Sequence, residues 1–144
     1  MDALELLKLD HAKVKKLFDQ AESAAEKEQK SIFTQIKTEL ETHASIEESV
    51  FYPAMQRYEE LKEMVAESLQ EHNNVKTLLQ EMATLSDSEA FQDKLEELID
   101  NVEHHAEDEE EGKMFPKVRE LVSANELEKL GAQLQAAKGQ RKAS

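Results

Sequence analysis

The chain carries one sequence pattern twice, and each copy places a histidine at the same point. Residues 10–18 read DHAKVKKLF and residues 71–79 read EHNNVKTLL, so His11 and His72 correspond at an offset of 61 residues. A duplicated helical pattern of this kind predicts two copies of one helical hairpin.

A second pair of histidines follows the same duplication. His43 precedes two glutamates and then FYP at 51–53, while His105 precedes a glutamate run and then MFP at 114–116. Each predicted hairpin therefore carries one histidine early and one histidine with carboxylates late.

Composition points to helices alone. The 144 residues include only 3 Gly and 2 Pro, and residues that lose little freedom in a helix dominate. Hydrophobic residues make up 39% of the chain and recur at three- and four-residue steps, which is typical of amphipathic helices and argues against disorder. The predicted fold class is all-α.

Four long helical stretches are predicted, followed by a shorter fifth. Asp2 is expected to cap the first and Ser31 to begin the second, while Pro53 and Pro116 disturb the ends of the second and fourth. The sequence SANE at 123–126 resembles a capping box that opens the fifth helix. Short connections favour an antiparallel up-down-up-down four-helix bundle. We expect this bundle over residues 1–122, a short C-terminal helix over 123–138 and a flexible tail over 139–144.

All four repeated histidines lie on predicted apolar faces, at similar heights along the bundle when residues are counted from the turns. One histidine on such a face is usually a core residue with a single hydrogen bond. Four in one layer would leave ring nitrogens unpaired, at about 1–3 kcal/mol for each unsatisfied group, and bound cations remove this penalty. A metal centre held by His11, His43, His72 and His105 is therefore favoured over four structural histidines.

Carboxylates near two of the histidines extend this ligand set. Glu47 follows His43 by four residues, so both side chains share one helix face. In the second copy the four-residue spacing favours Glu109, whereas alignment on the following proline favours Glu110, which would require a local bulge in the helix. Glu109 is preferred on spacing, and both residues are retained as candidates.

The remaining polar residues nearby are expected to be solvated or electrostatic neighbours. These are Glu48, Glu107, Asp108 and Glu111. His104 lies about 100° around the helix from its neighbour His105 and is expected to point outward.

The donor set also bears on the metal. The chain has no Cys, so a site must use imidazole and carboxylate. Six ligands exceed the four of a closed structural zinc site, and calcium or magnesium prefers oxygen donors. The set instead predicts a two-metal site with open positions, best suited to iron, with manganese, zinc or cobalt as substitutes in vitro.

Charge and hydropathy exclude several partners. A net charge of −14 repels nucleic acid and anionic membranes, and no basic stripe with interleaved aromatics compensates. No apolar run approaches the roughly 20 residues that cross a bilayer, and the first residues lack the basic start of a secretory signal. We therefore expect a soluble, cytoplasmic monomer; a dimer formed through the fifth helix is compatible with the sequence.

These motifs resemble the hemerythrin-like, HHE cation-binding family over roughly residues 2–122. The resemblance is carried by Asp10-His11, His43 with Glu47, Phe51-Tyr52-Pro53, Glu71-His72, and His105 with Glu109, Glu110, Glu111 and Phe115-Pro116. It implies a four-helix bundle holding a non-haem di-iron centre, with bridging carboxylates and a bridging oxo or hydroxo group. It also implies that the chain carries or senses dioxygen, senses or stores iron, or acts in oxidative or nitrosative stress.

Two departures from the family pattern bear on function. Oxygen-carrying hemerythrins have a His-x-x-x-His pair on the third helix, but here His72 is followed four residues later by Lys76. A water, another carboxylate or a tyrosine, Tyr52 or Tyr58, is the expected substitute, and reversible oxygen carriage becomes the weaker expectation. The second departure is the extra residue after His105, a wider spacing that hemerythrins themselves show.

Three functions fit the sequence. The leading expectation is a di-iron protein that binds or responds to dioxygen or related small oxidants, in oxygen, redox or iron sensing or in a stress response. The alternatives are a di-iron enzyme that consumes peroxide, oxygen or nitric oxide, and an iron buffer without redox chemistry.

Overall fold

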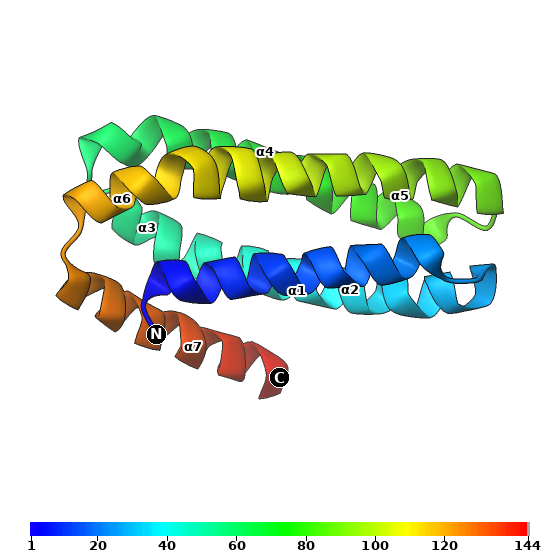
Figure 1. Cartoon of the computed structure of the whole chain (residues 1–144), viewed down its shortest axis with the longest axis horizontal. Coiled ribbons are helices and arrows are strands. Elements are labelled where there is room, and N and C mark those ends of the chain that lie inside the picture. The colour runs from blue at the N-terminus through cyan, green and yellow to red at the C-terminus, as the bar shows by residue number, and fades with distance from the viewer. Residues whose placement is uncertain (144) are drawn as a thin grey trace.

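The computed structural model describes residues 1–143, and every element within that range is a helix. The four long helices are α1 (Ala3–Ser23), α2 (Glu26–Ile46), α4 (Lys62–Thr84) and α5 (Ser88–Glu103). Helices α1 and α2 lie side by side, as do α4 and α5, and the two pairs pack together into a bundle (Figure 1). The predicted all-α four-helix bundle with an added C-terminal helix is confirmed.

Shorter elements extend the second and fourth long helices. They are the π-helical segment η1 (Glu47–Phe51) and helix α3 (Tyr52–Met55) after α2, and the π-helical segment η3 (His104–Met114) and helix α6 (Phe115–Leu121) after α5. The 3₁₀ turn η2 (Glu59–Leu61) leads into α4. A π-helix bonds residue i to residue i+5, is rare, and occurs mostly as a short bulge at functional sites. Both copies of the repeat change helix type at this point.

The start of α2 differs from the sequence prediction. Asp2 caps α1 in a reciprocal capping box with Glu5, as predicted for the first helix. However, α2 begins at Glu26 and not at Ser31. The buried Gln29 side chain explains the difference, because its amide donates to the Ala21 carbonyl at 3.0 Å and fixes a tight turn between α1 and α2.

The C-terminal helix is longer than predicted. Helix α7 spans Ala124–Ala143, so residues 139–143 of the expected tail are helical, and Ser144 lies outside the described residues. Alanine, lysine, arginine and glutamine favour the helix here. Figure 1 shows α7 beside the N-terminal part of α1. Its leucines Leu127, Leu130 and Leu134 are buried in the core.

The apolar core consists of two clusters along the bundle. One includes Leu4, Phe51 and Phe115, and the other includes Phe18 and Leu95. Three of the repeated histidines, His43, His72 and His105, are among the buried polar residues, and along the chain each lies between residues of the two clusters. None of the helices within residues 1–143 is long and apolar enough to span a membrane.

Candidate metal centre

Four imidazoles from four different helical segments meet in this polar layer. His11 comes from α1, His43 from α2, His72 from α4 and His105 from η3, and each side chain is less than 10% exposed. The rings pair, with centroids 4.9 Å apart for His11 and His43 and 4.8 Å apart for His72 and His105. The structure therefore brings together all four histidines singled out in the sequence.

Two fully buried carboxylates lie between the imidazole pairs. Glu47 Oε1 is 3.1 Å from His43 Nε2 and 3.0 Å from His72 Nε2. Glu110 approaches one histidine of each pair, with Oε1 3.1 Å from His11 Nε2 and Oε2 3.5 Å from His105 Nε2. Each carboxylate therefore reaches both halves of the site.

The structure places Glu110, and not Glu109, at the site. The π-helical backbone of η3 is the cause, because five-residue periodicity puts Glu110 on the face of His105. Glu109, preferred above on four-residue spacing, is turned toward the surface and binds Lys113 at 3.2 Å. His104 points outward as expected, with a side chain 56% exposed.

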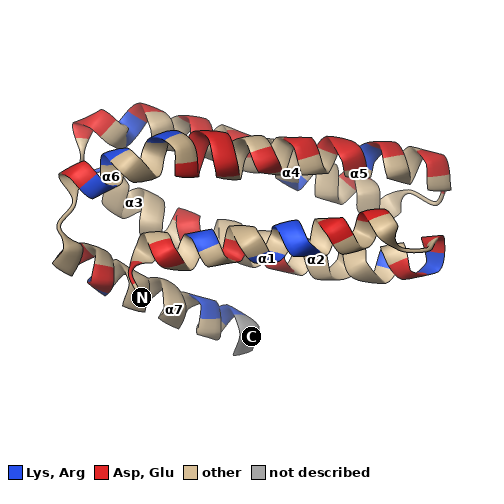
Figure 2. Ribbon diagram, in the orientation of Figure 1, with Lys and Arg blue, Asp and Glu red and all other residues tan. Residues whose placement is uncertain are grey.

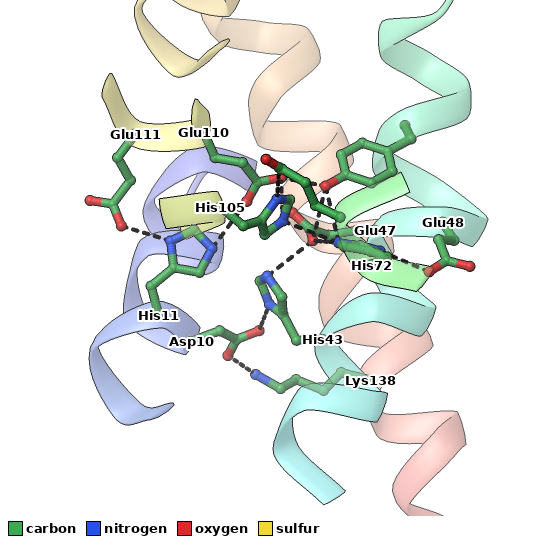
Figure 3. Close-up of polar contacts among 12 residues, drawn as sticks. Asp10, His11, His43, Glu47, Glu48, His72, His105, Glu110, Glu111 and Lys138 are labelled. Carbon is green, nitrogen blue, oxygen red and sulfur yellow. Dashed lines mark hydrogen bonds and ion pairs between the residues drawn. The ribbon is translucent and has the colours of Figure 1, made fainter. Parts of the chain in front are cut away.

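A second group of carboxylates holds the outer nitrogen of every imidazole (Figure 3). The Nδ1 pairs are Glu111 with His11 at 2.7 Å, Asp10 with His43 at 3.0 Å, Glu48 with His72 at 2.8 Å and Glu71 with His105 at 2.6 Å. Such partners fix the orientation and tautomer of a metal-binding histidine and raise its basicity.

Sequence reasoning did not assign this role, since it predicts that Glu48 and Glu111 are solvated or electrostatic neighbours of the site. A usable signal was present in the duplication. Asp10 and Glu71 each precede a repeated histidine, and Glu48 and Glu111 each follow a carboxylate of the site. The positions correspond between the two copies of the repeat.

The hydrogen bonds at Nδ1 determine what the inner nitrogens can bind. A neutral imidazole has one N–H, so donation from Nδ1 leaves a lone pair on Nε2. These lone pairs face carboxylate oxygens, which are also acceptors. Four of the buried atoms make no hydrogen bond: His11 Nε2, His43 Nε2, Glu47 Oε2 and Glu110 Oε1. A cation satisfies them all, and two donors each about 2.1 Å from one ion lie about 3 Å apart.

Protons compete with a metal for these atoms. Burial alone would lower the pKa of His72, but Glu47 and Glu48 raise it to about 9. Burial likewise opposes charge on His43, yet Glu47 and Asp10 raise its pKa well above the usual value. The pKa of Glu47 is lowered well below its ordinary value because His43 and His72 outweigh its desolvation. The site is built for positive charge.

Tyr52 brings a phenolic hydroxyl to this cluster. It donates a hydrogen bond to Glu110, and its oxygen lies 3.2 Å from Glu47 Oε1 and 3.3 Å from His72 Nε2. Burial, reinforced by Glu110 and Glu47, raises the pKa of Tyr52 well above its usual value. Of the two tyrosines considered from the sequence, only Tyr52 reaches the site, because Tyr58 binds Glu126 at 3.0 Å.

The second copy has no such hydroxyl. Phe115 occupies the repeat position of Tyr52 and stacks against His11, with centroids 6.2 Å apart and planes 9° apart. The two halves of the site are therefore alike in their imidazoles and carboxylates and unlike in this one group.

A pocket of about 310 Å³ leads to the four histidines. Its other walls combine apolar side chains, including Val14 and Leu40, with polar ones, including Glu48, Lys76 and Arg141. Lys76 is exposed. Lys76, the position at which the sequence departs from the oxygen-carrying hemerythrins, thus lines the pocket that leads to the four histidines.

Comparisons with known proteins agree with this geometry. The sequence model described as Hemerythrin HHE cation binding domain matches residues 2–118. The crystal structure of a hemerythrin HHE cation binding domain-containing protein from Mycobacterium kansasii is similar, with a TM-score of 0.85 and 29% identity, over 97% of this chain and 86% of that one. A DNA nickase of Nostoc sp. (strain PCC 7120) is 29% identical over 140 residues, which are 96% of this chain and 39% of the relative. This chain therefore spans well under half the length of that relative.

Proposed function

This chain belongs to the hemerythrin HHE cation-binding domain family, and we propose that it binds two iron ions and uses them to bind or respond to dioxygen or a related small oxidant. One observation carries the proposal. Four buried Nε2 atoms face two shared carboxylates, while a further carboxylate holds the Nδ1 atom of every ring.

The ligands divide into two positions. His11 and His43 would hold one ion and His72 and His105 the other, with Glu47 and Glu110 shared between the ions. We call these the His11–His43 position and the His72–His105 position. Mixed nitrogen and oxygen donors of this kind suit iron.

Charge balance favours a metal that changes oxidation state. The two shared carboxylates and the four on Nδ1 supply six negative charges around neutral imidazoles. Two ferrous ions leave this group net negative, and two ferric ions bring it to neutrality. Buried charge must be compensated locally, so the surroundings support the oxidised pair.

The bound iron would supply electrons to an oxidant, and the protein would control access and protons. The apolar part of the pocket wall, which includes Val14, Leu40 and Leu79, would reduce the water near the site. Tyr52 holds a proton on its hydroxyl oxygen and donates it in a hydrogen bond to Glu110, so a proton donor lies beside both shared carboxylates. Glu48 and its three counterparts keep the imidazoles oriented throughout.

The proposal does not extend to DNA nicking. The net charge of −14 disfavours contact with a phosphate backbone, and the Nostoc relative is much longer than this chain. We propose a cytoplasmic monomer, on the grounds of the cysteine-free composition and the acidic charge.

Anaerobic loading with two equivalents of ferrous iron, followed by exposure to dioxygen, tests the proposal. We expect the charge-transfer absorption of ferric iron to appear and to disappear on reduction. The His72→Gln variant should lose this response, and the exposed-site control His104→Gln should keep it. If the absorption of iron-loaded protein does not change on exposure to dioxygen, the proposal fails and the iron-buffer alternative is favoured. Sustained turnover of peroxide or nitric oxide would establish the enzyme alternative.

A further inference from the structure

The C-terminal helix contributes a side chain to the surroundings of the metal centre. Helix α7 lies beyond the residues 2–118 that match the family. Figure 2 shows basic residues near its C-terminal end. One of them, Lys138, donates a short hydrogen bond to Asp10, the carboxylate that holds His43 (Figure 3).

This ion pair is largely buried, unlike the other lysine pairs at the surface. The Lys138 side chain is 15% exposed and the Asp10 side chain 7% exposed. Both Asp10 oxygens are in use, Oδ1 by Lys138 and Oδ2 by His43 Nδ1 at 3.0 Å. Burial would raise the pKa of Asp10, but His43 and then Lys138 lower it, so the carboxylate stays charged.

The other copy of the repeat lacks an equivalent cation. Glu71 corresponds to Asp10 and holds His105 Nδ1 at 2.6 Å. Its other oxygen lies 3.6 Å from the half-exposed ring of His104. No lysine or arginine forms an ion pair with Glu71 among the described residues. Within residues 1–143, a lysine is therefore ion-paired to Asp10 behind His43, and none is ion-paired to Glu71 behind His105.

Close packing keeps this lysine in place. A Cβ atom at Gly131 would collide with the Met1 carbonyl oxygen and lie 2.9 Å from the Asp2 carbonyl carbon. Only glycine allows α7 to approach the start of α1 this closely, and the buried leucines of α7 secure the contact. Lys138 is thus carried to Asp10 by a packed helix.

We propose that Lys138 is a positioning residue that makes the two metal positions unequal, by weakening metal binding at the His11–His43 position. A cation bonded to Asp10 draws electron density from the carboxylate, and Asp10 then supports His43 as a donor less strongly than Glu71 supports His105. The charge of Lys138 also repels a bound cation directly. The inference rests on the two-metal part of the proposed function and not on its redox part.

Cobalt(II) titration of metal-free protein, followed by the visible absorption of the bound ion, tests this. In a His72→Gln background, which disables the His72–His105 position, Lys138→Met should tighten the remaining site about tenfold. In a His43→Gln background the same change should leave the remaining site unaltered. Lys138→Arg, which keeps the charge, should behave like lysine, and Lys129→Met controls for charge elsewhere on α7.

The outcomes separate the alternatives. Unchanged cobalt affinity on Lys138→Met in the His72→Gln background overturns the proposal. Equal weakening of cobalt binding in both backgrounds, together with a lower melting temperature, also overturns it, because that is the result expected if Lys138 only anchors α7. Wild-type protein that fails to bind two cobalt ions overturns the metal pair itself, before any variant is compared.

Discussion

Glu110 stands five residues after His105, and its Oε2 atom lies 3.5 Å from the Nε2 atom of that histidine. The first copy reaches the same arrangement with four residues, from His43 to Glu47, in α-helical geometry. The π-helical segment η3 absorbs the extra residue and keeps the second carboxylate in register.

Replacing this carboxylate should remove metal binding selectively. Glu110→Gln takes away a charged group shared by both positions, so metal affinity should fall by more than the roughly tenfold to hundredfold typical of outer partners. Glu109→Gln, one residue away and facing the surface, is the matched control and should bind metal normally. Isothermal titration with ferrous or cobalt ions measures both, and equal losses in the two variants would place Glu109 at the site.

Sequence alone predicted the bundle and the histidine layer, because three- and four-residue periodicity and the duplication report directly on helix faces. It preferred Glu109 because that spacing assumes an α-helix, and a π-helical bulge leaves no clear mark in composition. Glu48 reaches His72 because η1, the extension of α2, packs near α4. Residue spacing within one helix does not predict how two helices pack. The early start of α2 depends similarly on a contact between helices, the hydrogen bond of Gln29 to the Ala21 carbonyl of α1.

The carboxylates on Nδ1 should influence affinity without binding metal themselves. Glu48→Gln weakens the acceptor for His72 Nδ1, so affinity at the His72–His105 position should fall about tenfold to hundredfold. Glu107→Gln, which disrupts only a surface pair with Lys15, should change nothing. Competition with a chelator of known affinity compares the variants, and unaltered binding in Glu48→Gln would contradict this role.

Removing the Tyr52 hydroxyl should alter the site while preserving the fold. The corresponding position in the second copy is Phe115, so a phenyl ring suits this part of the repeat. In metal-free protein, Tyr52→Phe leaves Glu110 without its donor and should cost about 1–3 kcal/mol in the free energy of unfolding. Tyr58→Phe removes a part-buried bond to Glu126 and should cost less. Urea denaturation measures both, and equal effects would argue against a special environment at Tyr52.

Metal-free protein should lose stability as pH rises through the alkaline range. The pKa of His72 is raised to about 9 from its ordinary 6.5, so its contribution is fully present below pH 6.5 and disappears as pH rises through 9. The loss should be on the order of a few kcal/mol, and smaller in His72→Gln. Unfolding free energies at both ends of this range, with a chelator present, provide the measurement.

Metal should reverse this trend. A bound ion needs the deprotonated imidazole, so apparent affinity should increase as pH rises from 6.5 to about 9. The metal-loaded protein should therefore gain stability over the range in which the metal-free protein loses it. Parallel pH profiles for the two forms would mean that protons and metal do not share the His72 nitrogen.

Counting iron on the purified chain by metal analysis, with Mössbauer spectroscopy to resolve the ions, tests the central claim most directly. The account predicts two iron ions per chain in the wild type, and loss of at least one when His72 and His105 are both replaced by Gln. One ion or none in iron-supplied wild-type protein, or two ions retained without these histidines, would contradict it.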